Sequence, residues 1–181
     1  VNLSEANLWG AILYRSNLTG ANLSGARLSN ADLSQSELTG ADLSNAELYN
    51  TQLMGANLSE ANLTRADLQK AKLTSTNFHR ANLTSAWLAS AQLQDANLSQ
   101  ANLFKSTLNS ANLRDADLSQ ANLMEASLIK ANLQDVDLQD ADLNKTILFK
   151  ASVSKAALIK AQLCLTSLPD YTMRSRDCDR S

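Results

Sequence analysis

Few residues in this chain of 181 residues have side chains suited to catalysis or metal binding. His79 is the only histidine, and Cys164 and Cys178 are the only cysteines, so no His and Cys set with the spacing of a zinc site is present. General acid–base or nucleophilic catalysis needs further side chains that converge on His79, and the sequence offers none. We therefore expect no enzymatic activity, no cofactor and no metal. Two cysteines are too few for a disulfide framework, and we expect both to be free thiols.

Aspartates form the one concentrated pattern of charge. They recur at intervals of twenty residues in two series two positions apart: Asp95, Asp115 and Asp135, and then Asp117 and Asp137. If the chain returns to the same place every twenty residues, these five carboxylates line one edge, about 5 Å apart. Such an edge could present an acidic strip to a basic protein or bind a divalent cation. The simplest interpretation is a solvated charged edge.

Net charge and hydropathy exclude several classes of partner. The net charge is −2, which argues against direct binding to nucleic acid or to an anionic membrane. Polar residues interrupt every apolar run long before the ~18–20 residues that a membrane span needs. No signal peptide is visible at the start of this sequence, so we expect a cytoplasmic protein.

A five-residue repeat must position all of these side chains. From residue 3 to residue 168, every fifth residue is leucine except Phe78 and Val153, and the residue two places earlier is usually alanine. A helix would scatter these leucines around its whole surface, whereas an extended segment places both residues on one face. All five glycines follow a leucine by two positions, where a tight corner requires a positive φ. Each repeat is therefore predicted to be a short extended side followed by a corner.

A superperiod of twenty residues predicts four sides per coil. The residue before each leucine is almost always Asn or Asp in two of the four columns obtained by counting every fourth repeat, and seldom so in the other two. Stacking then gives about eight coils around a column of apolar side chains. The predicted core column comprises Leu23, Leu43, Leu63, Phe78 and Leu83.

The repeats ANLSG at 21–25 and ADLSN at 41–45 match the motif A(D/N)LXX, and residues 1–168 thereby resemble the pentapeptide-repeat family. This resemblance implies an all-β fold, a right-handed quadrilateral parallel β-helix. Some quinolone-resistance members of the family are acidic, dimeric rods that mimic duplex DNA and bind DNA gyrase. The resemblance thus makes gyrase or another topoisomerase a candidate partner.

The two ends of the rod are expected to differ. We predict an unbroken register over 1–168, with 169–181 forming a C-terminal cap and a disordered tail from Arg174; the cap would use Leu168, Tyr171 and Met173. Outward apolar side chains in the first coil, beside an open β end, favour a homodimer through that coil. The candidate self-association residues are Trp9, Ile12 and Tyr14. A vanished upstream segment is the alternative.

The expected function is a non-enzymatic repeat scaffold that presents a protein-interaction surface to a partner that the sequence does not identify. The alternative is a DNA-mimicking regulator of DNA gyrase or another topoisomerase that acts through the acidic edge. Near the far end, Ile129, Ile147 and Phe149 also lie outward. They could form an interaction face, but we favour tolerated apolar surface.

Overall fold

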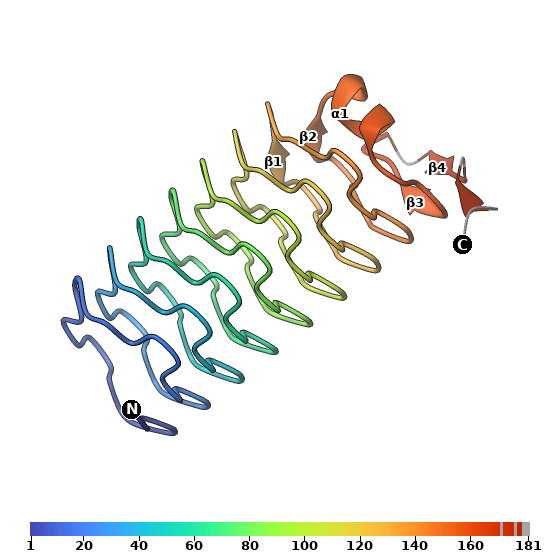
Figure 1. Cartoon of the computed structure of the whole chain (residues 1–181). Helices are drawn as coiled ribbons and strands as arrows, with labels where there is room; N and C mark the ends of the chain where they lie inside the picture. Colours follow the sequence, from blue (N-terminus) through green and yellow to red (C-terminus); the bar gives the residue numbers. More distant parts are fainter. Residues whose placement is uncertain (171, 176, 179–181) are drawn as a thin grey trace.

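The chain winds into a staircase of stacked coils in this computed structural model, which describes residues 1–170, 172–175 and 177–178 (Figure 1). Parallel β-bridges join the residue before each leucine to the residue twenty positions later, from Asn2 with Asn22 to Ile147 with Ser167. Four such bridges occur in each coil, so the rod has four sides, which we number by their first bridging residues: Asn2, Asn7, Ile12 and Asn17. The predicted twenty-residue coil is therefore observed as a four-sided parallel β-solenoid.

Leucine and alanine fill the interior of the rod. Leu23, Leu43, Leu63 and Leu83 stack along the first side, Phe78 takes a leucine position on the fourth side, and all five are 0% exposed. Each buried leucine removes enough apolar surface from water to contribute roughly 1.5–3 kcal/mol before the entropy cost of ordering the chain. The interior is closed and packed, and every chemically variable position lies outside.

Threonine replaces alanine inside the rod without leaving a hydroxyl unpaired. In each case Oγ1 donates a hydrogen bond to the carbonyl oxygen of the leucine 23 residues earlier, at 2.7–2.8 Å. The four residues are Thr51, Thr76, Thr146 and Thr166. A buried hydroxyl costs free energy only if it lacks a partner, so these positions tolerate the exchange.

The pairing of backbone N–H groups explains why the motif contains Asn or Asp. In a regular repeat, the N–H of Leu63 and that of the residue two places later donate to the next coil. The residue three places later donates to the Leu63 carbonyl across the corner, and the residue four places later donates to the preceding coil. The N–H of Thr64 remains, and it donates to Oδ1 of Asn62 at 3.2 Å. The Asn side chain thus satisfies the one N–H group that stacking leaves unpaired.

Each corner turns through a residue with positive φ. Every fifth residue from Glu5 to Lys150 has a φ between 55° and 66°, and this includes all five glycines. Together with the hydrogen bond across the corner, this is the pattern of a type II turn, whose third position favours Gly or Asn. The predicted role of the glycines is confirmed, although Lys, Arg, Gln and Asp occupy the same conformation at other corners.

A helix breaks the repeat near its far end, which the predicted unbroken register did not include. Strand β1, Asn132–Leu133, still pairs in parallel with β2, Ser152–Val153, but α1, Lys155–Lys160, replaces the fourth side of the next coil. Ser154 caps α1 by accepting the Ala157 N–H at 3.1 Å. Ala157 stands where that side otherwise carries Asn, Asp or Glu, so the side-chain acceptor of the corner is absent and alanine favours the helix. The coil that contains the helix still has twenty residues, so Asp142 again pairs with Gln162.

The C-terminal segment folds back on the last coil and is held by a disulfide. Strand β3, Thr166–Ser167, pairs antiparallel with β4, Met173–Arg174. Cys164 and Cys178 form a disulfide bond, so the expectation of free thiols is wrong. The spacing of fourteen residues hides this contact in the sequence, because only the antiparallel return of the chain brings the two sulfur atoms together.

Only part of the predicted cap matches the described segment. Leu168 is buried and its N–H donates to the Thr172 carbonyl at 2.7 Å, whereas Met173 is 57% exposed and covers little of the last coil. Arg174, predicted to begin a disordered tail, lies in β4. The Thr172 hydroxyl and N–H hydrogen-bond the Asp170 carboxylate and hold its pKa below the usual value. Tyr171 and the predicted disorder at 176 and 179–181 lie outside the described residues.

Replacing Gly40 by alanine should destabilise the rod by about 1 kcal/mol, because an L residue at φ +63° is strained. Nothing lies within 4 Å of the added Cβ atom, so the cost is conformational rather than steric. Gly40→Asn should lose less, since Asn tolerates this conformation. Urea denaturation measures the free energy of unfolding, and equal stability of the Ala variant and the parent protein would contradict the corner assignment.

Cys164→Ser should loosen the cap and leave the rest of the rod unchanged. Closing a loop of about fifteen residues is worth about 3 kcal/mol, and here that constraint acts on the C-terminal return alone. Hydrogen exchange of the Leu168 amide, which donates to Thr172, should accelerate. The Leu83 amide, which donates to the Asn102 carbonyl in the middle of the rod, is the internal control. Unchanged exchange at Leu168 would show that the disulfide does not hold the cap.

Candidate functional site

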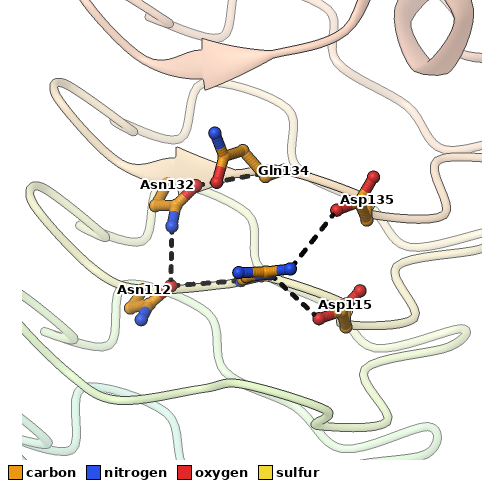
Figure 2. Close-up of polar contacts among 6 residues, drawn as sticks. Asn112, Asp115, Asn132, Gln134 and Asp135 are labelled. Carbon is orange, nitrogen blue, oxygen red and sulfur yellow. Dashed lines mark hydrogen bonds and ion pairs between the residues drawn. The ribbon is translucent and has the colours of Figure 1, made fainter.

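The predicted acidic edge exists in the structure, and an arginine lies within it. Asp95, Asp115 and Asp135 occupy successive corners between the third and fourth sides, each with a φ between 57° and 59°. Arg114 extends between two of them: Nε lies 3.2 Å from Asp115 Oδ2, and Nη2 lies 3.9 Å from Asp135 Oδ2 (Figure 2). These pairs are half exposed and add little stability, but they neutralise much of the local charge.

A ladder of amide side chains supports this arginine from the third side. Nδ2 of Asn132 donates to Oδ1 of Asn112 at 3.1 Å, and the same Oδ1 accepts the Arg114 N–H at 3.3 Å (Figure 2). The Gln134 N–H donates to Oδ1 of Asn132 at 3.2 Å in the next coil. The ladder orders the backbone from which Arg114 projects and adds no acidic group to the edge.

Asp117 and Asp137 serve the backbone rather than an acidic surface alone. Asp117 Oδ1 accepts the Ser119 N–H at 2.8 Å, and Asp137 Oδ1 accepts the Gln139 N–H at 3.0 Å. This is the role that Asn has elsewhere in the repeat. Asp137 also lies 3.9 Å from Nζ of Lys160. Within the part of the chain that the structure describes, Asp95 alone among the five predicted residues has neither an ion pair nor a side-chain hydrogen bond.

The first coil exposes the predicted apolar cluster along one side. Ile12 lies at the centre of the third side and is 84% exposed, while Trp9 and Tyr14 occupy the corners at its two ends. Tyr14 donates its hydroxyl to Oε1 of Gln35 at 3.0 Å, and the guanidinium of Arg15 lies 5.2 Å from the Tyr14 ring centre. Polar contacts thus hold the Tyr14 end of the cluster in place.

His79 makes hydrogen-bond contacts within the rod. Its ring Nδ1 lies 2.9 Å from Oγ of Ser99, and its backbone N–H donates to Oδ1 of Asn77 at 3.1 Å. Among the described residues, no three side chains of His, Cys, Asp or Glu are grouped so as to hold a metal ion. None of the helices in the described chain is long and apolar enough to cross a bilayer.

Ile129, Ile147 and Phe149, which the sequence led us to interpret as tolerated apolar surface, belong to a larger surface in the structure. The second side and its two corners carry apolar side chains from the fifth coil to the eighth, with lysines beside them. We call this surface the Trp87 face. It comprises Trp87, Phe104, Met124, Ile129, Ile147, Phe149 and the corner residues Lys105, Glu125, Lys130, Lys145 and Lys150.

The signal for this face was present in the repeat. Its residues form sets separated by multiples of twenty, which lie one place before, one place after or two places after a leucine, and the superperiod places these sets in neighbouring columns. Reading each column separately hides the face, because no single column contains more than a few apolar or basic residues.

Comparison with known proteins is consistent with the observed coils. The family model described as Pentapeptide repeats matches the chain in eight copies, which together span residues 1–35, 21–59, 51–88, 61–100, 91–128, 101–140 and 126–163. No curated protein sequence matches the chain significantly.

Two solved structures illustrate the similarity. One is HetL, a pentapeptide repeat protein involved in heterocyst differentiation regulation from the cyanobacterium Nostoc sp. strain PCC 7120. It has 31% identity and a TM-score of 0.64, and the match covers 96% of this chain and 92% of HetL. A trypsin-treated form of QnrB1, a plasmid-mediated fluoroquinolone resistance protein, has 19% identity and a TM-score of 0.55, with 88% of this chain and 82% of QnrB1 covered. At that identity QnrB1 shares the fold alone. The repeats, the twenty-residue coil and these matches show that the chain belongs to the pentapeptide-repeat family.

Proposed function

We propose that this chain is a non-enzymatic repeat scaffold that binds a protein partner through its outer surface. The observation that carries the proposal is the contrast between the uniform interior of the rod and its variable outer surface. Leucine and alanine close the interior, while outward columns vary freely in charge and size over about eight coils. HetL, which covers nearly the whole chain, is described as involved in regulation, a role that suits a binding protein. The right-handed sense of the helix implied by the family resemblance is part of the same proposal.

The alternative function is DNA mimicry through the acidic edge, directed at DNA gyrase or another topoisomerase. The column of Asp95, Asp115 and Asp135 supports it, since carboxylates one coil apart resemble a short series of phosphates. Arg114 opposes it, because its guanidinium lies between two of the three carboxylates. We therefore place a protein-binding scaffold ahead of the DNA mimic.

The cellular compartment of the protein is part of the proposal, and the disulfide bond provides evidence about its redox state. The sequence led us to expect a cytoplasmic protein. Glutathione and thioredoxin keep most cytosolic thiols reduced, so a stable Cys164–Cys178 bond favours an oxidising compartment. Quenching native cells in acid and alkylating the free thiols would report the state of this pair directly.

Immobilised protein should retain a specific partner from a lysate of its native cells, and charge removal on the acidic edge should leave that capture intact. The matched variant changes Asp95, Asp115, Asp117, Asp135 and Asp137 to Asn, which keeps the side-chain oxygens with which residues 117 and 137 accept backbone N–H groups. Capture lost in this variant and at high salt would favour the DNA mimic, since contacts between charges are screened. Failure of the unchanged protein to retain any specific protein would contradict the scaffold function.

Self-association is proposed to use the first coil, whose outer surface exposes Trp9, Ile12 and Tyr14. Leu3, Leu8 and Leu13 of this coil are half-buried, whereas the leucines of the second coil are buried. Trp9→Ser with Tyr14→Ser should convert a homodimer to a monomer, as measured by light scattering, because the variant removes two exposed rings from the proposed interface. Trp87→Ser is the control, since it removes an exposed ring far from that coil. An unchanged mass in the double variant would exclude the first coil as the interface.

A further inference from the structure

The second side, at the centre of the Trp87 face, departs from the hydrogen-bonding rule that shapes the first and fourth sides of the rod. On the first side, Asn or Asp precedes nearly every leucine and accepts the N–H group two residues later. The corresponding column on the second side carries Trp87, Thr107, Ser127 and Ile147 in successive coils. Neither indole nor an isoleucine side chain can accept that hydrogen bond. These positions give up a stabilising contact and place apolar surface in solvent, with Trp87 51% and Ile147 41% exposed.

Aromatic rings and lysines are paired along both edges of this face. Nζ of Lys105 lies 4.8 Å from the Phe104 ring centre, and Nζ of Lys150 lies 5.1 Å from that of Phe149. A third pair extends the edge toward the N-terminal end, with Nζ of Lys70 5.2 Å from the Tyr49 ring centre. A cation over a ring is attracted to its π-face, so the lysines lie close to the apolar surface rather than away from it.

Positive charge on the face is only partly neutralised. On the corner between the first and second sides, Lys105 and Lys145 share one carboxylate, with each Nζ 3.5 Å from an oxygen of Glu125. On the corner between the second and third sides, Lys70, Lys130 and Lys150 lack a carboxylate within 4.0 Å in the described parts of the chain. The carboxylates of Asp117 and Asp137 project from the fourth side, opposite the Trp87 face. The outer surface is thus polarised across the rod.

A hollow marks the start of the apolar strip. It has a volume of about 380 Å³ and is lined by Gln69, Trp87, Ala89 and Thr107. The small side chain of Ala89 beside the exposed indole leaves room for an apolar side chain from another molecule. An aromatic residue at the edge of a hollow, surrounded by polar groups, is the usual composition of an anchor site in a protein interface.

We propose that the Trp87 face binds an acidic, apolar peptide segment of a partner protein. The apolar side chains of the peptide cover Trp87 and Ile147, and the carboxylates of the peptide contact Lys130 and Lys150 on one edge of the face. This inference rests on the scaffold function above and assigns that function to one surface and one class of partner. The partner's chemistry follows from charge complementarity, because three lysines of one edge lack an opposite charge on their own chain.

A lipid surface carries the same combination of apolar and anionic groups, and the structure favours the protein segment. Exposed Trp87 and Ile147 and the half-buried rings of Phe104 and Phe149 lie along a strip of four coils whose two edges are lined by lysines. A strip of about 15 Å matches an extended segment of roughly five residues at ~3.3 Å per residue. With a net charge of −2, the whole chain has no general attraction to an anionic bilayer.

The test is selection from a random peptide library displayed on phage, with the full-length protein immobilised. Selected peptides should be enriched in Asp or Glu together with apolar residues. Their affinity, measured by fluorescence polarisation, should fall about tenfold or more in Trp87→Ser and in Lys130→Glu. Met54→Ser and Arg80→Glu are the matched controls, because they remove an exposed apolar side chain on the corner between the third and fourth sides and reverse a positive charge on the corner between the fourth and first sides, and they should bind as the parent does.

Three results would overturn this inference. Basic peptides that depend on Asp95 or Asp115 would place the binding surface on the acidic edge and leave the scaffold function standing. Selected peptides whose affinity is the same in Trp87→Ser and in the parent would exclude the face in the same way. Sedimentation of the parent protein, but not of Lys130→Glu, with phosphatidylglycerol vesicles would identify a lipid surface as the occupant.

Discussion

Stacking of one coil directly on the next is the constraint on which the remaining structure depends. A side of five residues has too few backbone groups to form secondary structure alone, so each coil relies on hydrogen bonds to residues twenty positions away. Those bonds hold only if identical positions lie above one another at ~4.8 Å, which fixes the interior columns and the corners together. The N–H group that stacking omits is satisfied by Asn or Asp. The motif is thus the solution to a hydrogen-bonding problem.

The same constraint explains why the fold could be predicted from sequence and some of its details could not. Inward leucines, corner glycines and the four-column pattern are repeated many times along the chain. Because of this repetition, a conformational preference that is weak at one position can be recognised in the sequence. The helix α1 and the Cys164–Cys178 bond occur once each. Ala157 favours a helix only because it stands where the side-chain acceptor is missing, and the two sulfur atoms meet only after the chain reverses at β4. Single events at the end of a repeat leave no periodic signal.

For the outer surface, the sequence identified which residues share a column but did not determine which of their charges are neutralised by neighbouring side chains. Asp115 and Asp135 were placed together correctly by the twenty-residue interval. Arg114, in the neighbouring column, reaches both of them, and the length of its side chain decides the local charge. Lys70 shows the reverse situation, since the coil brings it over the Tyr49 ring from a different repeat, whereas Lys105 and Lys150 each lie over the ring of the preceding residue. Charge on a solenoid is a property of adjacent columns rather than of one.

Positions that violate the structural rule are therefore the most informative places on such a rod. The rod tolerates lysine or arginine in a strained corner because dozens of hydrogen bonds to adjacent coils over-determine the backbone there. A single corner can give up its Asn or Asp at small cost, and the second side does so in four successive coils from Trp87 to Ile147. The third side also lacks Asn or Asp at Gln52, Lys72 and Gln92, but the replacements there are polar. The second side differs because Trp87 and Ile147 leave apolar surface in solvent, opposite Asp117 and Asp137 and bordered by lysines paired with aromatic rings, as a contact surface requires.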